Sequence, residues 1–320
     1  AGNRTDLPAP AAIEISGETV DSTLMTRLWE RFIDKAQLVS MPAVYLRLKA
    51  VIENPSFSMA DVAAVISQDP AITARLLRQV NSPYFGFVAR IDTVSRAVNM
   101  LGTQQLHDLV LAASVAETFS GMSSDIMDMN LYWRRSVYCA TAARLLAARC
   151  NVRERERLFL AGLLRDIGHL IMYQAIPDVT QLALTQSRHD CRPLYQVERD
   201  MIGFDYGKAG GALLQHWQLP QSLWEPVELH VTPGKTTDYA LETALVHLAG
   251  ILAEQMDMDT DTDAETHHGN LIARIHPTAW HVTRLAPEQY ISIKEETDQE
   301  IDTAMSLIFP GQAERQTSSL

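Results

Sequence analysis

Apolar residues recur at helical spacing along most of this chain, and that periodicity constrains the fold more than any other feature. Leu24, Leu28 and Phe32, for example, are four positions apart, which places their side chains on one face of a helix. No segment shows sustained alternation of apolar and polar residues between hairpin turns, the pattern typical of β-strands. The sequence therefore predicts an all-α fold.

Short polar motifs predict where several helices begin and end. Ser58 with Asp61 three residues later is a capping-box pattern, and Asp69–Pro70 supplies an N-cap residue followed by a first-turn proline. Thr93 is expected to cap the next helix and Gly102 to end it. Long helical patterns are expected downstream at 132–150 and 155–175, and further helices near 179–189, 193–202, 207–217, 220–231, 238–256 and 287–308.

The helical patterns fall into two groups separated by a polar break at 121–125, so we expect two helical lobes. The N-terminal stretch mixes Pro, Gly, Thr and Ala without periodicity and predicts a loose leader. The expected parts are a flexible leader at 1–22, an N-terminal lobe at 23–122, a second lobe at 123–255, and an acidic loop with a C-terminal helical extension at 256–320.

Composition excludes several classes of function. The formal net charge is −12 and no stripe of Lys and Arg overrides it, so nucleic acid is not an expected partner. The three cysteines are widely spaced and form no C-x-x-C pair, which fits a reducing compartment. No apolar run approaches the roughly 20 residues of a spanning helix. We therefore expect a cytoplasmic protein that does not enter the membrane.

A series of strings in one register resembles the HDOD (HD-related output domain) family over roughly residues 36–250. The strings are LVSMPAV at 38–44, SQDPAITARLLRQVNSPYFG at 67–86, IDTVSRAVNMLG at 91–102, YWRRS at 132–136, FLAGLLRDIGHL at 159–170, the single residue Glu198, GFDYGKAGGALLQHWQLP at 203–220 and VELH at 227–230. The resemblance implies a helical bacterial signalling regulator whose second lobe is similar to the HD superfamily of metal-dependent phosphohydrolases.

In that superfamily a His, a His-Asp pair and a later Asp hold a divalent metal that activates water against a phosphoester. By resemblance, these ligand positions fall on residues that mostly cannot bind a metal. The first His falls on Arg135, the His-Asp pair on Arg165 and Asp166, a further His on Tyr206, a later His on His230, and the terminal Asp on Gly250. His169 stands where phosphodiesterase relatives often carry Lys, and we interpret it as a packed or capped histidine.

One Asp and one His are too few to replace the hydration of a catalytic divalent ion. The replacing arginines stay protonated at physiological pH. At about 4 Å and an effective dielectric constant near 20, one Arg opposes a divalent cation by roughly 8 kcal/mol before screening. The sequence therefore predicts no bound metal, no cofactor and no catalysis.

Three interpretations of the altered site remain open. In the first, Arg165 or Arg135 replaces the metal structurally by neutralising Asp166. In the second, both arginines extend to the surface. In the third, the two arginines form an anion pocket with Tyr206 and His230 that binds a nucleotide or phosphate without cleaving it.

The leading functional hypothesis is a non-catalytic regulatory module of signal transduction that acts through protein partners of unknown identity. The rival is a metal-dependent phosphohydrolase, acting on a cyclic dinucleotide, whose metal ligands lie elsewhere in the chain.

Two other motifs are interpreted structurally. The glycines of GKAGG at 207–211 are expected to permit close helix packing, and the acidic string at 256–268, with His267 and His268, is expected to form a loop.

Overall fold

The computed structural model describes residues 22–81, 90–120, 126–257 and 272–308. Every regular element in these ranges is a helix, which confirms the predicted all-α class. The first helices are α1 (Ser22–Leu38), α2 (Ala43–Ile52), α3 (Met59–Ser67), α4 (Pro70–Val80), α5 (Val94–Leu101) and α6 (Thr103–Ser120). They are followed by α7 (Met129–Arg149), α8 (Arg155–Leu164), α9 (Ile167–Ala175), α10 (Pro177–Asp190), α11 (Leu194–Ile202), α12 (Tyr206–His216), α13 (Gln221–Leu229), α14 (Ala240–Glu254), α16 (Pro277–Thr283) and α17 (Pro287–Ile308), with short 3₁₀ turns at Pro233–Lys235 and Gln255–Asp257.

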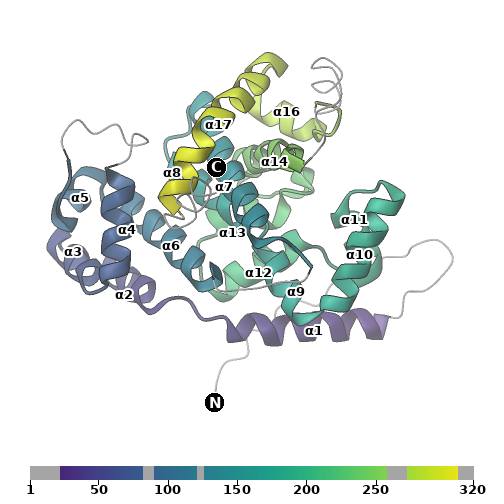
Figure 1. Ribbon diagram of the computed structural model, residues 1–320, viewed down its shortest axis with the longest axis horizontal. Coiled ribbons are helices and arrows are strands. Elements are labelled where there is room, and N and C mark those ends of the chain that lie inside the picture. Colours follow the sequence, from purple (N-terminus) through teal and green to yellow (C-terminus); the bar gives the residue numbers. More distant parts are fainter. Residues whose placement is uncertain (1–21, 82–89, 121–125, 258–271, 309–320) are drawn as a thin grey trace, which may run out of the picture.

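The buried apolar side chains form two clusters, one for each lobe. Helices α2 to α5 surround the smaller cluster, and they form a separate group on the left of Figure 1. Helix α6 contributes to both clusters, because Leu106 and Val110 enter the smaller one while Leu111 and Val115 enter the larger one. A single helix with two apolar faces therefore joins the lobes.

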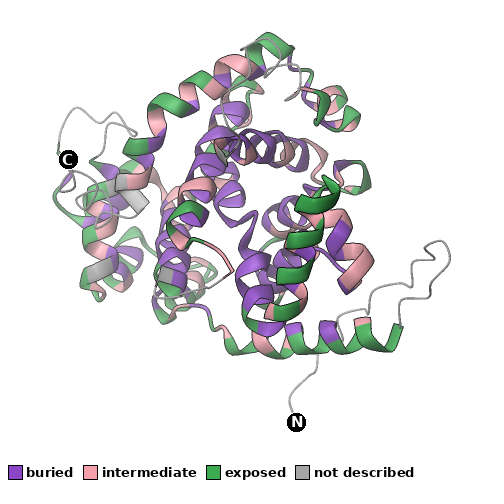
Figure 2. Cartoon of the chain, turned by 45° about the vertical axis from the view of Figure 1, so that its right-hand side comes forward, coloured by how far each residue is buried: buried purple, intermediate pink, exposed green. Residues whose placement is uncertain are grey.

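Helix α1 packs against the larger cluster, although the sequence analysis placed its residues in the N-terminal lobe. The Trp29 ring meets Phe204 edge to face at 4.8 Å and stacks on Phe32 at 5.2 Å. Figure 1 shows α1 running along the lower edge of the second lobe, beside α9 and α12. Figure 2 shows its outer face exposed, as the amphipathic pattern of α1 requires.

The predicted helix ends agree with the structure where local chemistry determines them. The Ser58 and Asp61 side chains form a reciprocal capping box, and the Thr93 hydroxyl accepts a hydrogen bond from the Arg96 N–H. Gly102 ends α5 with a φ of 78°, a left-handed conformation that favours glycine.

The helical pattern over 155–175 is divided into two helices in the structure. The chain breaks at Arg165 and Asp166, between α8 and α9, although neither residue is a helix breaker. Helix α9 approaches α12 closely just after the break, because a β-carbon on Gly168 would lie 2.1 Å from the Tyr206 carbonyl oxygen. Close packing of α9 against α12 therefore outweighs the local helical propensity.

Helix α17, from the predicted C-terminal extension, lies along α7 and also touches α4 and α6. It buries Tyr290 and Ile293 against the larger cluster. Ion pairs on its flank include Arg144 Nη2 with Glu300 Oε2 at 2.6 Å. Within the described ranges, none of the helices combines the length and apolarity needed to cross a membrane.

Candidate functional site

A buried arginine–aspartate pair lies at the break between α8 and α9. Arg165 donates two parallel hydrogen bonds to Asp166, from Nε to Oδ1 at 2.9 Å and from Nη2 to Oδ2 at 2.6 Å. The two residues are only 3% and 6% exposed. Burial alone would raise the pKa of Asp166, but the charge and hydrogen bonds of Arg165, with smaller contributions from His169 and His230, together outweigh burial and hold that pKa at about 2. Both groups therefore remain charged at neutral pH.

Gly250 of α14 provides the space that the Arg165 side chain occupies. A β-carbon at Gly250 would lie 2.1 Å from Arg165 Nη1, far inside van der Waals contact. An aspartate at this position, which the HD pattern requires, could not coexist with Arg165 in its present conformation. The arginine at 165 and the glycine at 250 are thus sterically coupled.

Glu254, one turn beyond Gly250, extends the pair into a small network. Arg165 Nη1 lies 3.6 Å from Glu254 Oε1, and Glu254 also forms an ion pair with Arg274. The guanidinium therefore links the end of α8 to α14 through the Glu254 carboxylate, while it also binds the neighbouring Asp166. This arrangement neutralises Asp166 without an ion.

His169 is packed and hydrogen-bonded, as predicted. Its ring stacks on Tyr206 at 4.1 Å and on Tyr173 at 5.3 Å. Its Nε2 lies 3.2 Å from Glu198 Oε1, while Glu198 Oε2 accepts a hydrogen bond from the Tyr206 backbone N–H at 2.9 Å. Glu198 thus links α9 to the first turn of α12, and burial raises its pKa.

His230 is buried beside the pair and keeps one nitrogen without a hydrogen bond. Its Nδ1 donates to the Val227 carbonyl at 2.7 Å, and no hydrogen-bond partner lies near Nε2 in the described chain. Its ring also tilts against Tyr206 at 5.4 Å. Burial, followed by the charge of Arg165, lowers the pKa of His230 to about 3. The imidazole is therefore neutral under physiological conditions.

Arg135, the other arginine at a ligand position, is not paired with Asp166. It is half-buried on α7, and its charge acts on Tyr173, where it opposes the pKa rise that burial causes. The structure therefore brings together most of the residues named from the sequence. Arg135 is the exception, since its charge acts on Tyr173. The residues that lie together are Arg165, Asp166, His169, Tyr206, His230 and Gly250.

These residues do not fit a divalent metal. Both oxygens of Asp166 already accept hydrogen bonds from Arg165, and the guanidinium charge would repel a cation. Across the four described ranges, no group of three or more His, Cys, Asp or Glu side chains is placed to hold an ion. A metal could enter only if Arg165 left its position.

Two carboxylates of the site were missed as site residues by sequence reasoning. Glu198 stood alone among the strings that carry the resemblance, and Glu254 lay near the end of an expected helix. Neither belongs to a spacing motif, so only the fold identifies their contacts with His169 and Arg165.

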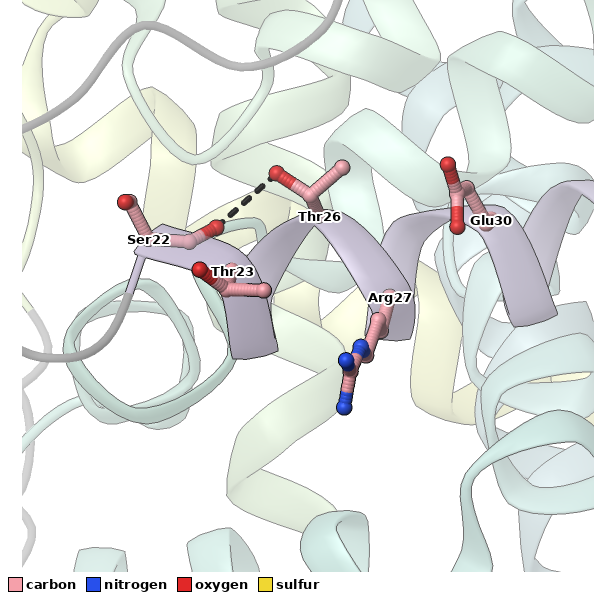
Figure 3. A pocket seen from close by; sticks show the side chains of 5 residues that line it. All are labelled: Ser22, Thr23, Thr26, Arg27 and Glu30. Carbon is pink, nitrogen blue, oxygen red and sulfur yellow. Dashed lines mark hydrogen bonds between the residues drawn. The ribbon is translucent and has the colours of Figure 1, made fainter.

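Other sequence motifs have structural roles or lie outside the described residues. A β-carbon on Gly207 would lie 2.7 Å from the Glu228 carbonyl oxygen, which confirms that GKAGG permits close helix packing. Most of the acidic string at 256–268, with His267 and His268, lies outside the described residues. Figure 3 shows a shallow hollow on α1 in which Thr26 Oγ1 donates to the Ser22 carbonyl at 2.8 Å. Its lining comes from one helix: Ser22, Thr23, Thr26, Arg27 and Glu30.

Several solved structures share the fold of this chain. An HDOD domain protein of unknown function from Geobacter sulfurreducens has a TM-score of 0.71 at 21% identity, covering 90% of this chain and 98% of its own. A protein from Shewanella amazonensis, provisionally called a phosphohydrolase, has a TM-score of 0.67 at 21% identity over 87% of this chain and 97% of its own. A protein from Marinobacter aquaeolei, provisionally called a signal transduction protein, has a TM-score of 0.61 at 17% identity, covering 89% of this chain and 65% of its own.

Sequence comparison gives the family directly. An uncharacterized protein of Treponema pallidum is 25% identical over 254 residues, which are 78% of this chain. The chain spans about half the length, 48%, of that relative. Residues 38–233 match the HDOD domain family. The chain therefore belongs to the HDOD family.

Proposed function

We propose that this protein is a non-catalytic module of signal transduction that works in the cytoplasm through protein partners. The observation that carries the proposal is the bidentate Arg165–Asp166 pair, seated in space that Gly250 leaves open. It supplies a fixed positive charge where the HD superfamily places a metal ion. Helices that the ion would join are then joined by side chains, and no activated water is needed.

The rival activity, metal-dependent hydrolysis of a phosphodiester, has less physical support. The name of the Shewanella relative suggests it, but that protein shares only 21% of its residues with this chain. His230 retains a buried Nε2 without a hydrogen bond, yet one imidazole cannot hold a catalytic ion. An anion pocket at this site also has less support, because the Arg165 guanidinium is already bound to Asp166 and faces Glu254.

The test is the metal content and phosphodiesterase activity of the purified full chain, without a polyhistidine tag. We expect far less than one equivalent of iron, manganese, zinc or nickel per chain, and no chelator-sensitive hydrolysis of a cyclic dinucleotide. The comparison variant is Arg135→His/Arg165→His/Gly250→Asp, which restores the donor types of the HD pattern and should retain more metal. Near-stoichiometric metal and hydrolysis in the unmodified chain would reject the proposal.

A further inference from the structure

A cleft of about 570 Å³ lies where the two lobes meet, away from the Arg165 site. One wall comes from the turn between α5 and α6, with Gln104, Gln105 and Asp108. The other wall is the turn between α7 and α8 and the first residues of α8, at 151–157. Its volume lies within the range of about 300–1,000 Å³ that is usual for small-molecule sites.

Two arginines of this cleft carry charges that no side chain in the described ranges neutralises. Arg153 and Arg155 are exposed, and neither forms an ion pair or hydrogen bond with another described residue. Arg157, by contrast, is paired with Glu154. A free pair of guanidinium groups two residues apart is well suited to a phosphate, which accepts parallel hydrogen bonds from such planar donors.

The helix termini at the cleft favour the same kind of ligand. The first turns of α6 and α8 both line it. The N-cap residue of α8, Glu154, makes no capping hydrogen bond through its side chain, and α6 follows Gly102, which has no side chain to cap with. Uncapped backbone N–H groups at two helix N-termini add to the attraction of the arginines for an anion.

The opposite side of the cleft holds a buried acceptor. The Asp108 side chain is only 8% exposed, yet it lines the cleft. Its Oδ1 faces Gln104 Nε2 at 3.1 Å and His107 Nδ1 at 3.2 Å. No donor in the described chain contacts Oδ2. This second oxygen is not enclosed by the protein, so it is free to accept a hydrogen bond from a ligand group that carries N–H or O–H.

Together these features select the ligand class. The cleft is lined by three arginines and three carboxylates, so its side-chain charges balance and it should bind a simple anion weakly. A ligand with a phosphate at one end and amino hydrogens at the other would match both sides. We propose that this cleft binds a nucleotide, with the phosphate held by Arg153 and Arg155 and an exocyclic amino group of the base donating to Asp108.

The position of the cleft would let such a ligand act on the junction between the lobes. Gln105 Nε2 of α6 already donates to Glu156 Oε1 of α8 at 2.9 Å across this junction. A nucleotide that contacts both walls adds further links of the same kind. This inference does not depend on whether the Arg165 site is catalytic, and the two can fail separately.

The test is isothermal titration calorimetry of the full chain with GMP and AMP, and with ribose 5-phosphate and inorganic phosphate as probes that lack a base. We expect GMP or AMP to bind at least about tenfold more tightly than ribose 5-phosphate, the effect of one charge-assisted hydrogen bond. The absence of binding by both nucleotides at millimolar concentration would overturn the inference.

Variants locate the binding site. Arg153→Ala/Arg155→Ala should weaken nucleotide binding about tenfold or more, whereas Arg27→Ala/Arg31→Ala, an equal loss of exposed charge on α1, should leave it unchanged. Asp108→Asn should weaken GMP or AMP but not ribose 5-phosphate. Unchanged affinity in the Arg153/Arg155 variant, or equal weakening in the α1 control, would reject this cleft as the site.

Discussion

Gly250 lies so close to Arg165 that a β-carbon on the glycine would be 2.1 Å from the guanidinium Nη1. The absence of a side chain at 250 is therefore a condition for the conformation of the arginine at 165. Since the resemblance to HD proteins places metal-ligand positions at both residues, the two changes are best understood as one structural replacement.

Replacing Gly250 with alanine should destabilise the protein by about 1–3 kcal/mol, the usual cost of forcing extra atoms into a packed interior. Arg165 would have to leave its position against Asp166, because the new methyl group would overlap Nη1. Urea unfolding followed by circular dichroism measures the change. Gly234→Ala is the matched control, since its nearest neighbour would be His276 at 3.3 Å, and its cost should be clearly smaller. Equal costs would contradict the steric argument.

Removing Arg165 should cost more than removing Arg135. Arg165→Ala leaves Asp166 buried and without its charged partner, a change that typically costs about 3–5 kcal/mol. Arg165→Ala/Asp166→Ala removes both charges and should recover part of that loss in a double-mutant cycle. Arg135→Ala is the control from the same predicted site. If Arg165→Ala left the free energy of unfolding unchanged, the structural role of the pair would be wrong.

The parts of this fold that follow from local chemistry could be predicted from the sequence. The Ser58 and Asp61 capping box and the Gly102 terminus depend on residues within a few positions of each other. The break at Arg165 and Asp166 could not be predicted from the sequence, because it depends on how closely α9 approaches α12 at Gly168. Arg is a good helix former and Asp a weaker one, but Asp occurs inside helices, so propensity alone does not place a break here.

The candidate site shows the same division. The resemblance placed Arg165, Asp166 and Gly250 at metal-ligand positions. It did not reveal why these three residues occur together. That reason is a contact between residues 85 positions apart, on the end of α8 and the middle of α14. The role of Glu254 depends on the same non-local contact.

Acid should destabilise the protein in two stages. The pKa of His247 is lowered to about 4 and that of His230 to about 3, mainly by burial, from an ordinary value of 6.5. Between pH 6.5 and 4 the unfolded chain binds protons that the folded chain does not, so stability falls as pH falls. Each histidine contributes about 1.4 kcal/mol per pH unit there.

The Asp166 carboxylate acts in a lower range. Its pKa is lowered to about 2 from 3.8, so its contribution is complete above pH 4 and is lost as pH falls toward 2. Urea unfolding at several pH values measures both stages. His247→Asn keeps a donor for the His230 carbonyl and should reduce the slope between pH 6.5 and 4. A slope unchanged in that variant would show that His247 is not responsible.

Helix α17 should loosen when its polar contacts with α7 are removed. The Tyr138 hydroxyl donates to Asp298 Oδ1 at 2.6 Å, next to the Arg144–Glu300 ion pair. Tyr138→Phe should cost about 1–3 kcal/mol, because the acceptor is charged and the donor is buried. Amide hydrogen exchange should then accelerate in α17 and at its contacts with α4 and α6. The half-buried Tyr239, whose hydroxyl forms no hydrogen bond with another described residue, serves as the control in Tyr239→Phe. Faster exchange throughout the second lobe, without preference for α17, would show instead that Tyr138 supports the core as a whole.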